Sequence, residues 1–106
     1  MNDDQNRIWQ YLQNNAVGKN NKKTTSQIRD ACFLASGGPT NEYVRELVRG
    51  MIIDHSCCIG SLMWSGGYWI INSENELNEV INSLQNRANS IHRRVDAIRR
   101  NWDERE

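Results

Sequence analysis

The chain has 106 residues, and its formal net charge is zero because 13 Lys and Arg residues balance 13 Asp and Glu residues. This length suits one small domain and excludes a large α/β enzyme with a separate cofactor domain. The zero charge argues at first against nucleic-acid binding, since proteins of that class usually carry a basic excess.

No segment has the features of a membrane span or a secretory signal. The longest apolar stretches, such as residues 68–71, are far shorter than the roughly 18 residues that a membrane helix needs. The start of the chain is polar and acidic, which does not fit a signal peptide. Two of the three cysteines, Cys57 and Cys58, are adjacent, so we expect no disulfide framework and a reducing, cytoplasmic setting.

The first predicted helix follows from apolar residues at helical spacing. It covers residues 4–14, and Asp3 or Asp4 is the expected N-cap. A polar, basic loop at residues 18–23 interrupts the pattern and separates this helix from the next.

Two further helices are predicted before the middle of the chain. Thr24 or Thr25 caps the second helix, which ends at the turn of residues 36–39. The third helix covers residues 40–52. The residues expected in the shared core are Ile8, Trp9, Leu12, Ile28, Ala31, Cys32, Val44, Leu47, Val48 and Met51.

A hairpin and a long helix complete the predicted architecture. Aromatic and β-branched residues predict strands at residues 57–60 and 68–71, and Gly66-Gly67 suits the connecting turn. The sequence Ser73-Glu74-Asn75-Glu76 has the pattern of a capping box and opens a helix running to about Trp102. The fold class is therefore mainly α with a small β-hairpin: a winged helix-turn-helix at residues 1–72 and a long C-terminal helix at residues 73–106.

Several motifs across residues 7–100 carry a resemblance to a known family. They are Gly18 to Lys23, Thr25-Ser26-Gln27-Ile28-Arg29, Gly38-Pro39, Val44-Arg45-Glu46-Leu47-Val48, Ile59-Gly60-Ser61, Gly67-Tyr68-Trp69, Ser73-Glu74-x-Glu76-Leu77 and Ser83-Leu84-x-x-Arg87-Ala88-x-Ser90-Ile91. On these motifs the chain is similar to small winged helix-turn-helix proteins encoded by phages and prophages. The resemblance implies a winged-helix fold, double-stranded DNA as partner and a bacterial host cell as location.

The third predicted helix is the expected recognition helix, because the second helix of a helix-turn-helix enters the major groove. Asn41 suits adenine and Arg45 suits guanine, since their forked side chains match those base edges. Tyr43 and Thr40 are candidates for phosphate or a thymine methyl, and Arg49 for the backbone. Further phosphate contacts that position the protein are expected from Lys19, Lys22, Lys23, Thr25 and Arg29.

A different interpretation of the same helix remains open. Glu42 and Glu46 alternate with the two arginines, so the helix could present a solvated face of ion pairs or a protein-binding face. Trp64 at the tip of the hairpin could stack on a base, enter the minor groove, dock a partner, or fold back onto the core. The bulky Met63 and Trp64 depart from the small polar or basic wing tips that are more usual.

The zero net charge conceals blocks of opposite sign. Residues 19–29 hold four basic residues and no acid, a sum of +4, and residues 50–86 hold four acids and no Lys or Arg, a sum of −4. Residues 87–100 hold five Arg and one Asp, again +4. The balance is therefore a cancellation, and local attraction to DNA is compatible with it.

The final helix carries an apolar seam with alternating spacings of four and three residues, the heptad pattern of a coiled coil. Its members are Leu77, Ile81, Leu84, Ala88, Ile91, Val95, Ile98 and Trp102. We expect an antiparallel homodimer, because a parallel pair would place Arg94 against Arg99 and Arg87 against His92. The alternative is a monomer whose long helix folds back on the first helix through Ile8 and Trp9.

The remaining residue clusters predict no enzyme, cofactor or metal site. Cys32, His55, Cys57 and Cys58 lack the paired spacing of a zinc site, and buried small cysteines are the better interpretation for at least some of them. His92 lies at the edge of the seam. We therefore expect a non-enzymatic DNA-binding protein of phage type in transcription or replication control, with an adaptor that binds a host or phage protein as the alternative.

Overall fold

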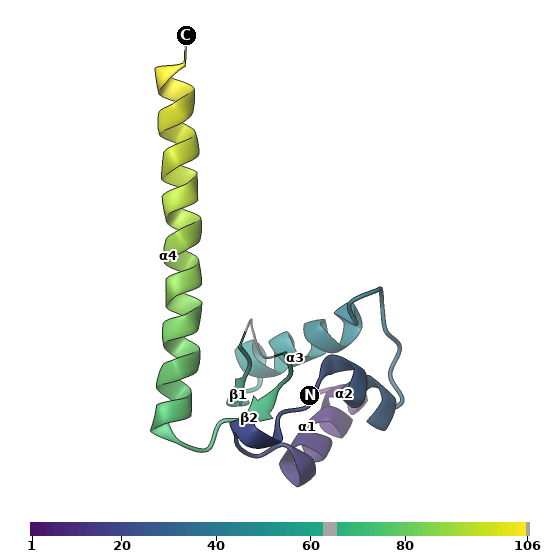
Figure 1. The fold of residues 1–106 in the computed structure, drawn as a ribbon. Helices are drawn as coiled ribbons and strands as arrows, with labels where there is room; N and C mark the ends of the chain where they lie inside the picture. Colours follow the sequence, from purple (N-terminus) through teal and green to yellow (C-terminus); the bar gives the residue numbers. More distant parts are fainter. Residues whose placement is uncertain (63–65, 106) are drawn as a thin grey trace.

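Three helices and a two-stranded sheet form a small head, from which one long helix projects (Figure 1). The computed structural model describes residues 1–62 and 66–105. The elements are α1 (Asp3–Asn15), the 3₁₀ helix η1 (Lys19–Asn21), α2 (Thr25–Ala31), α3 (Glu42–Asp54), β1 (Ile59–Gly60), β2 (Trp69–Ile70) and α4 (Glu74–Glu104). A mainly helical chain with a small antiparallel sheet and a long C-terminal helix is confirmed.

The first helix begins at Asp3 and is capped by Asn2, one residue before the nearer of the two predicted caps. The Asn2 side chain accepts a hydrogen bond from the backbone N–H of Gln5 at 2.7 Å, and the Gln5 side chain accepts from the N–H of Asn2 at 3.1 Å. The prediction of Asp3 or Asp4 as N-cap is therefore wrong. Both lie in the first turn, where a negative charge is favoured by the helix dipole.

Left-handed residues set the limits of α2 and α3. Thr24 caps α2 as predicted, but α2 ends at Ala31 and not near residue 36, since Phe33 adopts a φ of 57° that no helix can continue. Asn41 has φ 57° and ψ 46°, so α3 begins at Glu42 rather than at Thr40.

The sheet is shorter than predicted and gains a neighbour. Ile59 pairs with Ile70 and Gly60 with Trp69, in antiparallel register. On the other edge of β2, the backbone of Lys23 exchanges hydrogen bonds of 2.9 and 2.8 Å with Tyr68, which the sequence did not predict. A Cβ at Gly67 would lie 2.8 Å from the Lys23 carbonyl oxygen, so this close approach requires glycine.

The core of the head agrees with most of the predicted set. Buried as expected are Ile8, Leu12, Ile28, Cys32, Val44, Leu47, Val48 and Met51. Ala31 is exposed, so this prediction is wrong, whereas Trp9 is partly buried and packs against the core. The largest fully buried side chain is Trp69, which the sequence did not single out.

The base of α4 is fastened to the head through Trp69 and Glu76. The Trp69 indole packs over Gly60, where a Cβ would lie only 2.9 Å from the ring. Ser73 caps α4, but the capping box is only half formed. The Glu76 carboxylate turns to the head instead, accepting from the N–H of Lys19 at 3.0 Å, from Trp69 Nε1 at 3.1 Å and from the N–H of Asn72 at 3.2 Å.

The charge of Glu76 is expected to stabilise this junction. The backbone N–H of Lys19, followed by the other donors, lowers the pKa of Glu76. A lowered carboxyl pKa adds stability above the unfolded pKa of about 4.3, and this stability is lost as the pH falls through the folded pKa. Glu76→Gln should therefore lower the Tm at pH 7, and its Tm should fall less than that of the wild type on acidification to pH 3. Thermal unfolding checks this, with Glu74→Gln on the exposed side of the same helix turn as the control; equal Tm values for the two variants would contradict it.

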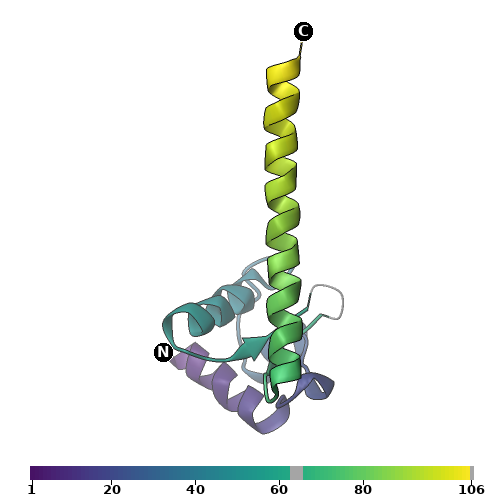
Figure 2. The ribbon, with the colours of Figure 1, turned by 90° about the vertical axis from the view of Figure 1, so that its left-hand side faces the viewer.

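Beyond its base, α4 extends away from the head (Figures 1 and 2). The radius of gyration is 16.8 Å, whereas a compact chain of this length has about 13 Å. In the alternative interpretation, α4 folds back along α1 and packs on Ile8. This is not the arrangement observed, because Ile8 is enclosed in the core of the head. In the described part of the chain, no helix combines the length and apolar character needed to cross a membrane.

Candidate nucleic-acid interface

The start of α3 is held against α2 by a buried amide. Asn41 is only 6% exposed. Its Oδ1 accepts from Arg29 Nη1 at 2.8 Å, and its Nδ2 donates to the hydroxyls of Thr25 and Ser26 at 3.1 Å each. Both ends of the amide are engaged inside the head, so these hydrogen bonds compete with the predicted contact of Asn41 with adenine. Arg29 acts in the same network and also pairs with Asp30 at 3.0 Å, and its phosphate contact stays a prediction.

Two further predicted contacts are taken up by the protein itself. The Tyr43 hydroxyl donates to the carboxylate of Asp4 in α1, and this bond raises the pKa of Tyr43. The Thr40 hydroxyl donates to Glu42 Oε1 at 2.8 Å and lowers the pKa of Glu42. Tyr43 therefore ties α3 to α1, and Thr40 has no free hydroxyl proton for a phosphate.

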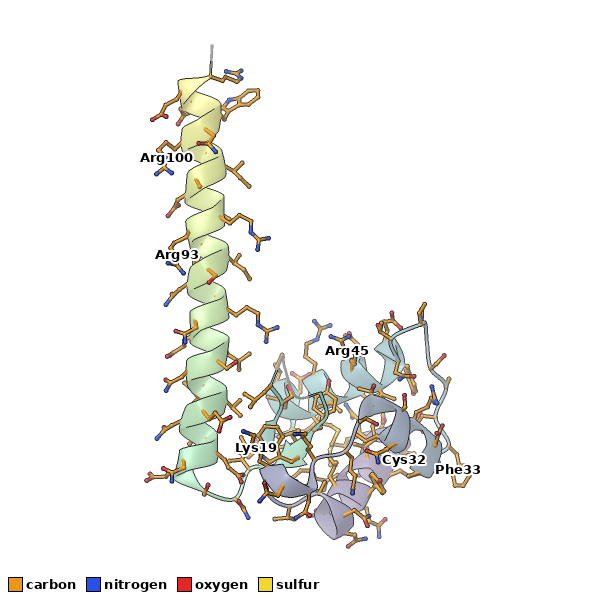
Figure 3. All side chains as sticks on the ribbon, viewed as in Figure 1. Lys19, Cys32, Phe33, Arg45, Arg93 and Arg100 are labelled. Atoms are coloured by element: carbon orange, nitrogen blue, oxygen red, sulfur yellow. The ribbon has the colours of Figure 1, made fainter. Side chains whose placement is uncertain are left out.

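The two arginines of α3 differ in their surroundings. Arg49 pairs with Glu46 at 2.5 Å across one helix turn, and both side chains are about two-thirds exposed. Arg45 is exposed and has no carboxylate partner among the described residues. It lies close to the Tyr68 side chain, where burial raises the pKa of Tyr68 and the positive charge of Arg45 opposes that rise. In Figure 3, Arg45 lies on the upper side of the head, and α4 extends upward past this side.

The three lysines of the basic loop lie in two places, one at the junction with α4 and two at the surface of the head. Lys19 Nζ pairs with Glu79 at 2.5 Å, so Lys19 fastens α4 to the head, and its phosphate contact stays a prediction. Lys22 and Lys23 are partly exposed, and neither is paired with a carboxylate within residues 1–62 and 66–105. These two lysines remain candidates for binding an anion.

A groove of about 440 Å³ lies where α2, α3, the hairpin and α4 meet. Thr25, Arg45 and Tyr68 line it from the head, and Arg87 lines it from α4. The predicted residues that the groove brings together are Thr25, Thr40, Asn41 and Arg45.

Sequence reasoning missed Tyr68 and Arg87 as lining residues. Arg87 follows Val80 by seven residues, or two helix turns, so the two share one face of α4. Val80 is buried, and this face of α4 is therefore the one turned to the head. The predicted role of Trp64 lies outside the described residues.

The seam of α4 is largely uncovered. Its large side chains from the second turn onward are 40–62% exposed: Ile81, Leu84, Ile91, Val95, Ile98 and Trp102. Ala88 is exposed as well, and Leu77 is partly buried at the base. Such a continuous apolar strip is typical of a surface that another helix covers.

Two of the three cysteines are buried, as predicted for at least some of them. Cys32 and Cys57 are buried and Cys58 is exposed, and all three are free thiols. Burial raises the pKa of Cys32 and of Cys57, which disfavours the reactive thiolate. Within the described ranges, no group of three or more His, Cys, Asp or Glu side chains is placed to hold a metal ion.

Comparison of the chain with protein-family models, with curated proteins and with solved structures finds no match.

Proposed function

We propose that the chain is a non-enzymatic, winged-helix DNA-binding protein of phage type, acting in transcription or replication control in a bacterial cytoplasm. The element order supports this: α2 and α3 are followed by an antiparallel hairpin, and a third backbone segment pairs along β2. In this proposal α3 is the recognition helix and the hairpin of β1 and β2 is the wing.

The observation that carries the proposal is the position of Arg45. Its exposed guanidinium, which pairs with no carboxylate of residues 1–62 and 66–105, lines a groove bounded by α2 and the hairpin. A guanidinium suits both phosphate and the edge of guanine, because its fork donates two parallel hydrogen bonds. Lys22 and Lys23 add two positive charges on the segment that pairs with β2.

Selection of bound fragments from total phage and host DNA tests the proposal. A sequence-reading protein is expected to enrich a common motif, and to bind it about 10³-fold or more tightly than random duplex. Recovery of random fragments alone would contradict sequence reading. Failure to retain DNA at low salt would contradict the proposal as a whole.

A second candidate, a protein-binding adaptor, is favoured by the acidic residues of α3. Glu42 and Glu46 are exposed on the surface that also holds Arg45 and Arg49. Carboxylates there repel phosphate and suit a basic or polar protein surface. In the DNA-binding proposal, Glu42 and Glu46 share a separate pocket with Arg45 and Arg49, and no carboxylate is among the described residues that line the groove of Arg45 and Arg87.

We further propose that a second copy of the chain covers the seam of α4 in an antiparallel coiled coil. In this register the layers Ile81–Ile98, Leu84–Val95 and Ala88–Ile91 form together. The same register places residues 93–100 of one chain against residues 79–86 of the other. The first segment carries four Arg and one Asp and the second carries only Glu79, so their charges attract. One kind of like-charge contact remains, between Arg87 and Arg94 of the partner subunit, and it occurs twice along the same flank.

Replacement of Ile91 at the centre of the seam tests the dimer. Ile91→Asp is expected to give a monomer of about 12.3 kDa where the wild type sediments as twice that mass, because a carboxylate cannot be buried unpaired in the seam. Ile53→Asp is the matched control, since Ile53 is 71% exposed outside the seam and should leave the dimer intact. A wild type that stays monomeric at all concentrations in analytical ultracentrifugation would overturn this proposal.

A further inference from the structure

The base of α4 contributes to the same groove as the proposed recognition helix. Arg87 of α4 and Arg45 of α3 line this groove of about 440 Å³ together with Thr25 and Tyr68. Neither guanidinium is paired with a carboxylate in the described part of the chain. Two positive charges that share a groove without a counter-charge repel each other, and an anion between them removes that cost.

The donors around the groove suit a phosphate group. The Thr25 hydroxyl accepts from Asn41 Nδ2, so its own proton is free to be donated. Each arginine can donate a bidentate pair of hydrogen bonds to phosphate oxygens. The groove is therefore built around side-chain donors from α2, α3 and α4.

A second groove of about 710 Å³ continues from Arg87 along α4 and reaches Arg94. Arg87 and Arg94 lie two helix turns apart on one face, about 10 Å along the axis. The carboxylate in this groove, Glu79, is neutralised by Lys19 at 2.5 Å. A basic track from Arg45 through Arg87 to Arg94 fits an extended phosphodiester chain better than one isolated phosphate.

We infer that Arg87 binds a backbone phosphate of double-stranded DNA lying in the angle between the head and α4, and that Arg94 contacts the same backbone further along. The long helix is then part of the DNA interface as well as of the seam. This inference rests on the proposed DNA-binding function, and it adds two residues that the sequence placed only on the flank of the coiled coil.

Fluorescence anisotropy with a random labelled duplex tests the inference, using Arg87→Gln, Arg87→Lys and Arg93→Gln. Arg93 is the matched control, because it lies on the side of α4 away from the head (Figure 3). Arg87→Gln should weaken binding about 10-fold and reduce the slope of log K against log salt by about 0.9, the value for one phosphate that is no longer neutralised. Arg87→Lys should keep most of the slope, and Arg93→Gln should bind as the wild type does.

Several outcomes separate this inference from the function on which it rests. If the wild type binds DNA with a steep salt dependence while Arg87→Gln equals Arg93→Gln, the inference is wrong and the proposed function stands. If the wild type does not bind duplex, the proposed function itself fails. Displacement of the duplex by millimolar inorganic phosphate at constant ionic strength would identify a site for free phosphate and overturn the DNA assignment. A changed mass of Arg87→Gln in sedimentation would assign the weaker binding to self-association and also overturn it.

Discussion

Replacing Trp69 with alanine is expected to destabilise the head by about 3–5 kcal/mol, the usual cost of truncating a large buried aromatic side chain. Trp69 is fully buried. It also donates from Nε1 to Glu76, which itself holds Lys19 and the start of α4. The variant therefore loses the packing over Gly60 together with the bond that orients the junction.

Urea unfolding followed by circular dichroism measures this effect. A small domain has a total stability of about 5–15 kcal/mol, so the variant should lose a large part of it and unfold at a much lower urea concentration. Phe33→Ala is the control, since Phe33 is 91% exposed and its truncation should change the stability by less than about 0.5 kcal/mol. Similar urea midpoints for the two variants would show that Trp69 does not hold the head together.

Neutralising Lys22, Lys23 and Arg45 together is expected to weaken DNA binding about 100-fold at low salt, since three positive charges are removed from the interface. Arg45 has the largest single share, because it enters the groove of α2, α3 and α4 whereas the lysines lie beside it. The slope of log K against log salt should fall by about 3, close to 0.9 for each phosphate that the variant no longer neutralises.

The matched control for this triple variant removes the same number of positive charges elsewhere. Arg93, Arg100 and Arg105 replaced by Gln lower the net charge equally, and Figure 3 places Arg93 and Arg100 on the outer side of α4. This control should retain most of the affinity. If both triple variants lose affinity alike, binding depends on net charge and the groove is not the interface.

The long helices could be predicted because each carries a regular apolar pattern. The cap of α2 at Thr24 was also predictable, since a threonine three residues before Gln27 forms a local capping box. The early end of α2 was not, because it depends on a left-handed conformation at Phe33, for which phenylalanine has no local preference. The pattern of α4 predicted its length and its seam, but not that Val80 is the side chain buried at its base.

The candidate site was predicted less well than the fold, for a physical reason. Short polar side chains near a recognition helix suit DNA and suit internal hydrogen bonds equally well, and the sequence does not show which partner is near. Asn41 and Tyr43 are engaged by residues 12–39 positions away in the chain. Arg45 kept its predicted accessibility because its long side chain extends beyond these hydrogen bonds.

The salt dependence of DNA binding by the wild type tests the central claim most directly. If Arg45 in its groove and the two lysines beside it bind duplex, log K should fall linearly with log salt with a slope of about −2.7 or steeper, roughly a 40-fold loss or more from 50 to 200 mM salt. The contributions of Arg87 and Arg94 would make the slope steeper still. No binding of duplex at 50 mM salt, or a slope near zero, would contradict the DNA-binding account and favour the adaptor.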